Sequence, residues 1–167
     1  ALLIVDSFGP RGIKERCGAN YWTHPVDRVG DAYGALAWLA TQPFVDPQRI
    51  ALLGYSQGAI VALAAVSRGG EEALFDRRFR TVITYYPYCG LDNGAVTAPT
   101  LILIGERDQW TPAEACRKMM ARRNGDGEPV RLVVYPDAHH GFDMASLRDR
   151  PLDYLGYRLG YNEAADR

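Results

Sequence analysis

A serine between two glycines stands where a short apolar run gives way to an alanine-rich segment. The run is Ile50–Tyr55, and residues 54–58 read GYSQG, a G-x-S-x-G pattern. Between a strand and a helix, this pattern forms a turn so sharp that the serine hydroxyl projects above the sheet. Such a serine can attack a carbonyl carbon, and the next N–H points to the oxygen that becomes negatively charged. The pattern therefore predicts Ser56 as a nucleophile and the Gln57 N–H as an oxyanion donor.

Three histidines are available as the base that such a serine needs. His24 precedes a proline at the start of a predicted helix, away from the carboxyl end of every predicted strand. His139 and His140 follow the last apolar run, so one of them is placed to face Ser56, and the spacing does not decide between them. A metal site is disfavoured because adjacent histidines rarely converge on one ion and no acidic or cysteine ligands accompany them.

A carboxylate that could orient the histidine follows the apolar run Thr100–Gly105. Asp108 stands there in front of a predicted helix and completes the chain order Ser, Asp, His that α/β-hydrolases use. Such a carboxylate holds the imidazole in one tautomer and stabilises the imidazolium. Asp92, Glu106 and Asp137 are the alternatives.

These side chains need a sheet whose strands end at a common edge. Short runs of Val, Ile, Leu and Tyr alternate with helix-like segments, which indicates parallel strands covered on both faces. The runs are Ala1–Asp6, Ile50–Tyr55, Thr81–Tyr86, Thr100–Gly105 and Val130–Tyr135. Helices are predicted over residues 26–41 and 57–68 and after a capping box at Thr111–Glu114. The alternation predicts an α/β fold whose functional residues gather at the carboxyl ends of the strands.

The composition fits one globular domain, residues 1–167, without repeats or linkers. Lys and Arg number 19 and Asp and Glu 20, a net charge of -1, whereas nucleic-acid-binding proteins carry clustered basic residues. The longest apolar stretch, Ala59–Val66, is too short to span a bilayer. We therefore expect neither a nucleic-acid nor a membrane partner. Three cysteines without a C-x-x-C pair exclude a zinc ribbon and a disulfide-dense miniprotein.

Two of the cysteines belong to the same predicted edge of the sheet. Cys89 follows the run Thr81–Tyr86, and Cys116 lies in the first turn of the helix after Asp108. A disulfide between them is feasible, and two separate thiols are the alternative. A disulfide would fit a periplasmic or secreted protein and free thiols a cytoplasmic one, so the sequence leaves the localisation open. No partner for Cys17 is evident.

Together these motifs resemble the dienelactone hydrolase family of α/β-hydrolases, from Ala1 to about Tyr161. The resemblance rests on residues 5–12, 46–50, 54–58, 105–112 and 135–143. The last segment is similar to the family's Y-P-x-A-x-H-x-F-D signature, whose histidine falls on His140. The resemblance therefore implies the triad Ser56, Asp108 and His140. Dienelactone hydrolases proper use a cysteine nucleophile, and the serine in this chain implies a wider range of esters.

The resemblance also suggests residues that contact the substrate. Arg11 falls in the region where the family places an arginine that binds the substrate carboxylate; a surface arginine is the alternative. The aromatic residues Tyr86, Tyr88, Trp110 and Phe142 are separate candidates for the wall of the pocket, with burial in the core as the alternative.

A complete fold of this kind has about eight strands, and the resemblance assigns the five runs to the fourth through the eighth. The loop after the third strand supplies the second oxyanion N–H, and no matching motif occurs in this sequence. We therefore expect a chain truncated at both ends and lacking the N-terminal strands.

The expected function is that of a serine hydrolase that cleaves small carboxylic esters or lactones through an acyl-enzyme. It needs no metal or organic cofactor, and its oligomeric state is left open. The alternative is a catalytically weak or inactive fragment with an incomplete oxyanion hole.

Overall fold

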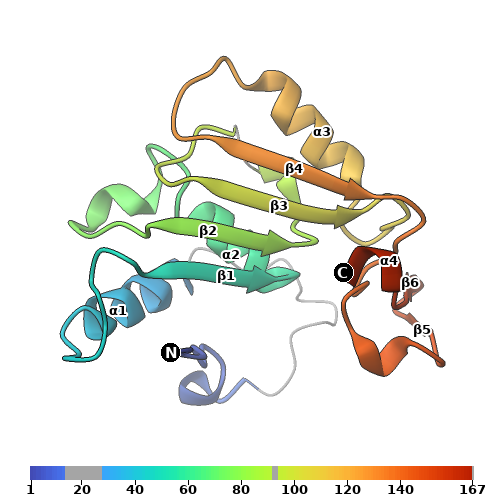
Figure 1. The fold of residues 1–167 in the computed structure, drawn as a ribbon, viewed down its shortest axis with the longest axis horizontal. Helices are drawn as coiled ribbons and strands as arrows, with labels where there is room; N and C mark the ends of the chain where they lie inside the picture. The colour runs from blue at the N-terminus through green and yellow to red at the C-terminus, as the bar shows by residue number, and fades with distance from the viewer. Residues whose placement is uncertain (14–27, 92–93, 167) are drawn as a thin grey trace.

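The structure, a computed structural model, describes residues 1–13, 28–91 and 94–166. Its centre is a parallel sheet of four strands in the order β1-β2-β3-β4 (Figure 1). The strands are β1 Ala51–Tyr55, β2 Thr81–Tyr85, β3 Thr100–Gly105 and β4 Val130–Tyr135. The α/β fold class and four of the five predicted strands are confirmed, and the four strands end at the same edge of the sheet.

The predicted strand Ala1–Asp6 is wrong, because these residues form no strand and lie apart from β1 (Figure 1). Leu2 and Ile4 expose 82% and 84% of their surface. An extended segment joins a sheet only when its N–H and C=O groups pair with a neighbouring strand. Among the described strands, β2 alone pairs with β1. Apolar composition by itself does not place residues 1–6 in the sheet.

The predicted helices are present, each shorter than its sequence pattern. They are α1 Val29–Leu39, α2 Gln57–Ala64 and α3 Ala113–Arg122. Helix α2 packs on β1 and β2, α3 packs on β4, and α1 packs on α2. None of the helices formed by the described residues is long and apolar enough to cross a membrane.

The face of the sheet opposite α2 is only partly covered. Leu53 and Tyr55 point to this face, and 43% and 45% of their surface is exposed. We expected helices on both faces; the remaining described helix, α4 Glu163–Asp166, lies beyond the carboxyl ends of the strands (Figure 1).

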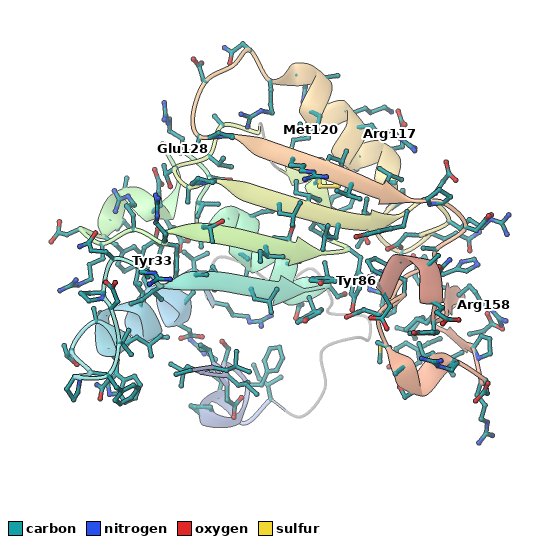
Figure 2. The ribbon with its side chains drawn as sticks, in the orientation of Figure 1. Tyr33, Tyr86, Arg117, Met120, Glu128 and Arg158 are labelled. Carbon is teal, nitrogen blue, oxygen red and sulfur yellow. A yellow bond between two sulfur atoms is a disulfide. The ribbon has the colours of Figure 1, made fainter. Side chains whose placement is uncertain are left out.

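A hairpin that no sequence pattern had predicted follows the sheet. Its strands, β5 Leu152–Tyr154 and β6 Tyr157–Leu159, pair antiparallel. Leu155 and Gly156 form the turn and have φ of 51° and 82°, as a type I′ two-residue hairpin turn requires. Gly156 was therefore a usable signal in the sequence. Figure 2 shows Arg158 of this hairpin and Tyr86 on the carboxyl-terminal side of the sheet. The described residues also form the 3-10 turns η1 Gly9–Arg11, η3 Glu71–Leu74, η4 Cys89–Leu91 and η5 Ala145–Leu147.

Strand β1 and helix α2 approach each other so closely that β1 needs a glycine. A Cβ atom added to Gly54 would lie 2.3 Å from the carbonyl oxygen of Gly58, whereas a Cβ added to Gly58 meets nothing within 4 Å. The two glycines of the G-x-S-x-G pattern therefore differ. The contact between β1 and α2 requires a glycine at position 54, whereas a larger side chain at position 58 would meet no steric obstacle.

We expect Gly54→Ala to lower the free energy of unfolding by about 1–3 kcal/mol or more, because the obstructing atoms are backbone and cannot move aside. Gly58→Ala should be neutral or should raise it by up to about 1 kcal/mol, since alanine favours the helix. Urea denaturation of the two variants measures the difference. Equal destabilisation by both would contradict the described packing of α2 on β1.

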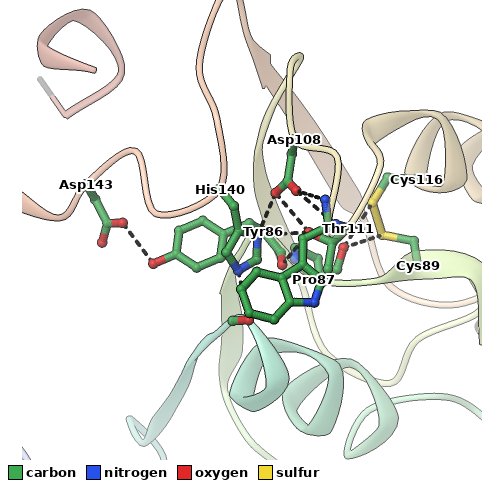
Figure 3. A network of polar contacts seen from close by, with 10 residues as sticks. Tyr86, Pro87, Cys89, Asp108, Thr111, Cys116, His140 and Asp143 are labelled. Atoms are coloured by element: carbon green, nitrogen blue, oxygen red, sulfur yellow. Dashed lines mark hydrogen bonds and ion pairs between the residues drawn. A yellow bond between two sulfur atoms is a disulfide. The ribbon is translucent and has the colours of Figure 1, made fainter. Parts of the chain in front are cut away.

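A disulfide joins η4 to α3. The sulfur atoms of Cys89 and Cys116 are bonded, and their Cα atoms lie 4.8 Å apart, within the limit of about 7 Å expected for such a bond. Both residues are buried. The bond ties the segment after β2 to the helix that follows Asp108 (Figure 3). Cys17 lies outside the described residues.

Replacing Cys89 and Cys116 together by alanine should lower the free energy of unfolding by about 2–4 kcal/mol, because the unfolded chain is no longer cross-linked. Urea denaturation of oxidised protein, reduced protein and the double variant tests this. The reduced protein should unfold like the variant. If reduction left the midpoint of the oxidised protein unchanged, the disulfide would carry no stability.

Candidate active site

Ser56 stands at the turn between β1 and α2 in a strained conformation. Its φ is 49° and its ψ is -115°, a combination that costs a residue with a side chain about 1–3 kcal/mol. Its N–H donates to the Tyr85 carbonyl oxygen at 2.9 Å, and its own carbonyl accepts from Ala59 and Ile60 in the first turn of α2. The backbone is therefore held on both sides while the hydroxyl is presented at the carboxyl edge of the sheet.

His140 comes from the loop after β4, which packs against the end of β3. A Cβ added to Gly105 would lie 2.2 Å from the Ala138 carbonyl oxygen, so only glycine lets the two segments approach this closely. The same carbonyl accepts a hydrogen bond from the Arg107 N–H at 2.9 Å. These contacts fix the main chain beside His140 to the segment that carries Asp108.

A continuous chain of hydrogen bonds links the three predicted side chains. The Nε2 atom of His140 lies 2.9 Å from Ser56 Oγ, and its Nδ1 atom lies 2.8 Å from Asp108 Oδ2. His140 and Asp108 are both 3% exposed. A carboxylate oxygen can only accept, so Nδ1 carries the proton and Nε2 presents its lone pair to the serine hydroxyl. It is His140, and not His139, that makes these contacts.

The Asp108 carboxylate is held by the turn in which it lies (Figure 3). Its Oδ1 atom accepts from the N–H groups of Trp110 and Thr111 at 2.9 and 2.8 Å. The Thr111 hydroxyl lies 2.9 Å from Oδ2, 3.0 Å from the Tyr86 carbonyl oxygen and 3.3 Å from His140 Nδ1. A buried carboxylate is stable only when its oxygens are hydrogen-bonded in this way.

The predicted capping box at Thr111–Glu114 does not form. Helix α3 begins at Ala113 with Pro112 as its N-cap and no side-chain cap, because the Thr111 hydroxyl is turned to Asp108 and Tyr86 instead. The sequence pattern identified the start of the helix and missed the contact between Thr111 and the carboxylate. An Asp whose side chain accepts from the N–H group two residues further on forms an Asx turn, and Asp108 preceding a helix start was the signal for it.

Tyr86 connects the end of β2 to the loop of His140. Its ring centroid lies 4.4 Å from that of His140, and its hydroxyl donates to Asp143 Oδ1 at 2.9 Å (Figure 3). Burial, followed by the nearby negative charge of Asp143, raises the pKa of the Tyr86 phenol far above its ordinary value. The phenol therefore keeps its proton and remains a hydrogen-bond donor to Asp143.

A cavity of about 1290 Å³ opens beside Ser56 and Gln57. It runs along β1 between α1, α2 and the exposed segment of residues 1–8. Trp110, a predicted pocket residue, lines it together with Tyr154 of the hairpin and Arg28. Arg28 Nη1 donates to the side-chain oxygen of Gln57 at 3.0 Å. Tyr154 and Arg28 were not among the predicted site residues.

The other predicted contact residues lie elsewhere. Arg11 makes a bidentate pair with Asp31 at 2.7 and 2.9 Å and is not among the residues that line the cavity. The Arg11 guanidinium holds the pKa of Asp31 below its ordinary value. Phe142 is completely buried among Tyr85, Tyr86 and Tyr135, so it is a core residue. Tyr88 is partly buried and does not line the cavity either.

Two of the alternative acidic residues form ion pairs with arginines. Glu106 and Asp137 pair at the surface with Arg117 and Arg107, and Asp92 lies outside the described residues, as does His24. Within the described part of the chain, no three His, Cys, Asp or Glu side chains are grouped in a way that could hold a metal ion.

A parallel sheet with a strained serine between strand and helix is the architecture of an α/β-hydrolase. The dienelactone hydrolase family model matches residues 11–167. The chain belongs to the dienelactone hydrolase family, as the sequence motifs had indicated.

Three individual proteins similar to this chain share a third or less of its residues over the aligned region. An uncharacterized protein of Mycobacterium tuberculosis is 32% identical over 129 residues, which are 67% of this chain and 45% of that protein. A Klebsiella pneumoniae protein provisionally described as a dienelactone hydrolase has a TM-score of 0.64 at 18% identity, covering 87% of this chain and 58% of that one. A Xanthomonas campestris α/β serine hydrolase without a lid has a TM-score of 0.56 at 24% identity, covering 78% and 54%. The two structures agree with the fold, and the chain spans less than half the length of the mycobacterial relative.

Thr111→Val should lower kcat by about 10-fold and leave KM little changed, because it removes a hydroxyl that positions Asp108 and touches no substrate. The expected loss corresponds to one hydrogen bond to a charged group, about 1.5 kcal/mol. Thr81→Val is the matched control, since the Thr81 hydroxyl also donates to a backbone carbonyl, that of Pro99 at 2.8 Å, far from the site. Steady-state kinetics and thermal unfolding of both variants separate the two effects. A similar loss of kcat in both would show that Thr111 acts only through stability.

Proposed function

We propose that this chain is a serine hydrolase of small carboxylic esters or lactones, with Ser56, His140 and Asp108 as its catalytic triad. The observation that carries the proposal is the unbroken chain of hydrogen bonds from Asp108 through His140 to Ser56. Membership in the dienelactone hydrolase family supports the hydrolase class. The activity of the whole protein is part of the proposal, because the chain spans only part of its relatives.

In the proposed mechanism Ser56 Oγ attacks the carbonyl carbon while its proton passes to His140 Nε2. Asp108 stabilises the imidazolium through Nδ1–H. The carbonyl oxygen becomes negatively charged and is stabilised by the Gln57 N–H at the start of α2. His140 then returns the proton to the leaving oxygen, which departs as an alcohol. A water molecule then attacks the acyl-enzyme while His140 takes its proton. The bond between the acyl carbon and Ser56 Oγ breaks, His140 returns the proton to Oγ, and the carboxylic acid leaves.

A serine in place of a cysteine favours ordinary esters over the dienelactone substrate. The alkoxide of serine is formed only as the base removes its proton, so the reaction depends on the His140 contact. The cavity beside Ser56 is wide and mostly apolar in its lining, which suits uncharged esters.

A catalytically weak protein is the second candidate. One edge of β1 has no partner among the described strands and lies beside Ser56, and the Gln57 N–H is the one oxyanion donor that we assign in the described residues. Removing one of two oxyanion donors typically lowers kcat by about 10²–10³-fold. Stoichiometric labelling of Ser56 by a fluorophosphonate together with slow turnover of p-nitrophenyl acetate would favour this candidate.

Ser56→Ala and His140→Ala should each lower the hydrolysis of p-nitrophenyl acetate by about 10³-fold or more, and the double variant should be little worse, because the residues act as a unit. Ser67→Ala, which removes a hydroxyl bonded to Leu63 at the far end of α2, should keep full activity. Undiminished esterase activity in Ser56→Ala would remove the proposal.

A further inference from the structure

Three aromatic side chains from two separate segments gather next to His140. Trp110 belongs to the turn of Asp108, and Tyr154 and Tyr157 belong to the β5–β6 hairpin. The Trp110 ring stacks on that of Tyr157, with centroids 5.1 Å apart and planes 8° from parallel, and lies 6.0 Å from that of Tyr154. The centroid of His140 is 5.1 Å from that of Trp110. We call these three residues the aromatic cluster.

The cluster is fixed relative to the triad from both sides. The Trp110 N–H donates to Asp108 Oδ1 at 2.9 Å, so its backbone is part of the turn that holds the carboxylate. The hairpin is tied to the histidine itself, because Gly160 N–H donates to the His140 carbonyl oxygen at 3.2 Å and Leu159 bridges to His140. Any group bound against the cluster therefore has a defined position relative to His140 Nε2.

Two members of the cluster, Trp110 and Tyr154, line the cavity that Ser56 lines. The charged residues Arg28, Asp46 and Arg49 also line it. Arg28 donates to the side chain of Gln57, whereas Asp46 and Arg49 precede β1 and stand at the end of the strand opposite to Ser56. Asp153 and Arg158 on the hairpin neutralise each other at 2.9 Å. The part of the cavity beside His140 thus offers aromatic surface to an uncharged group.

The mechanism determines which part of the substrate lies there. The leaving oxygen must come within hydrogen-bond distance of His140 Nε2 to receive the proton that Ser56 gave up. The carbon atoms attached to that oxygen therefore lie beside the side chains that flank His140 in the cavity. The acyl group is on the other side of the carbonyl carbon and extends away from the histidine.

We infer that the aromatic cluster is the binding site for the alcohol part of the ester, and that it selects arylmethyl alcohols. This rests on the proposed hydrolase function. The reaction is R–CO–O–CH2–aryl plus water giving the carboxylic acid and the arylmethanol, with the Ser56 proton delivered to the departing oxygen. Aromatic rings prefer stacked or edge-to-face contacts with centroids about 4.5–7 Å apart. Such contacts stabilise a complex by more than the burial of the same apolar area would.

The test compares benzyl acetate with cyclohexylmethyl acetate, which have the same acyl group and a ring of similar size. For the wild type, the ratio of kcat/KM for the benzyl ester to kcat/KM for the cyclohexylmethyl ester should exceed the ratio of their alkaline hydrolysis rates by about 3- to 10-fold. In Trp110→Leu the preference should fall to within about 2-fold of that chemical ratio, since leucine keeps the backbone N–H and an apolar side chain. Trp38→Leu is the matched control, because Trp38 is exposed on α1 and outside the cavity, and its preference should equal that of the wild type.

The acyl side is tested with methyl benzoate and methyl cyclohexanecarboxylate, for which Trp110→Leu should leave the ratio unchanged. A Trp110-dependent preference in the acyl pair with none in the alcohol pair would overturn the inference, as would equal preferences in the wild type and Trp110→Leu. Failure of the underlying function looks different, because the wild type would then show no Ser56-dependent hydrolysis of either acetate. In that event, binding of benzyl alcohol to Ser56→Ala by titration calorimetry decides: Trp110-dependent binding supports the subsite, and its absence removes it.

Discussion

The buried hydrogen bond between Asp108 and His140 is the constraint around which this end of the molecule is built. Its two partners come from loops 32 residues apart and are both shielded from water. A carboxylate out of water is costly unless several donors surround it. The turn after β3 supplies two N–H groups, and the hydroxyl of Thr111 lies within hydrogen-bond distance. The loop of His140 could not reach this position if β3 ended in any residue larger than glycine.

The segment after β2 supports the same pair from a third direction. The carbonyl oxygen of Tyr86 lies beside the Thr111 hydroxyl, its ring packs on His140, and its phenol is hydrogen-bonded to Asp143. Three residues later, Cys89 is bonded to Cys116 of α3. The disulfide and the Thr111 contact thus connect the same two segments at neighbouring points. The site gains rigidity from covalent and polar links, which matters because the cavity on its other side is open along β1.

The two sides of the site differ in the way that they are built. On the side of Asp108 and His140, buried residues and short hydrogen bonds define each position. On the side of β1, the strand edge has no described partner strand, and exposed apolar residues of the segment 1–5 face the cavity. The aromatic cluster lies at the border between these regions, since Trp110 is tied to the rigid turn while Tyr154 stands on a short hairpin. If the chain hydrolyses esters as we propose, the alcohol part of the substrate therefore meets a more rigid surface than the acyl part.

The sequence by itself determined the local structure around the chemistry. A G-x-S-x-G pattern between an apolar run and an alanine-rich segment predicts a strained serine without any long-range information, because the steric demand of that turn is local. The positions of four strands and of Asp108 followed from the alternation of apolar runs and turns. Spacing alone could not separate His139 from His140. The two are adjacent in one loop and point in different directions, and the packing of Ala138 on Gly105 sets the position of that loop.

Only the tertiary structure decided the remaining features, because each depends on partners distant in the sequence. Residues 1–6 have the composition of a strand and form none, as none of the described strands pairs with them. The sequence pattern predicts Thr111 as a helix cap, but its hydroxyl is turned to Asp108 and Tyr86. Phe142 and Arg11 were candidates for substrate contact, yet one is buried among tyrosines and the other is paired with Asp31. Composition and spacing specify which conformations a segment can adopt, and the pairing of its polar groups with residues far along the chain selects the one that is formed.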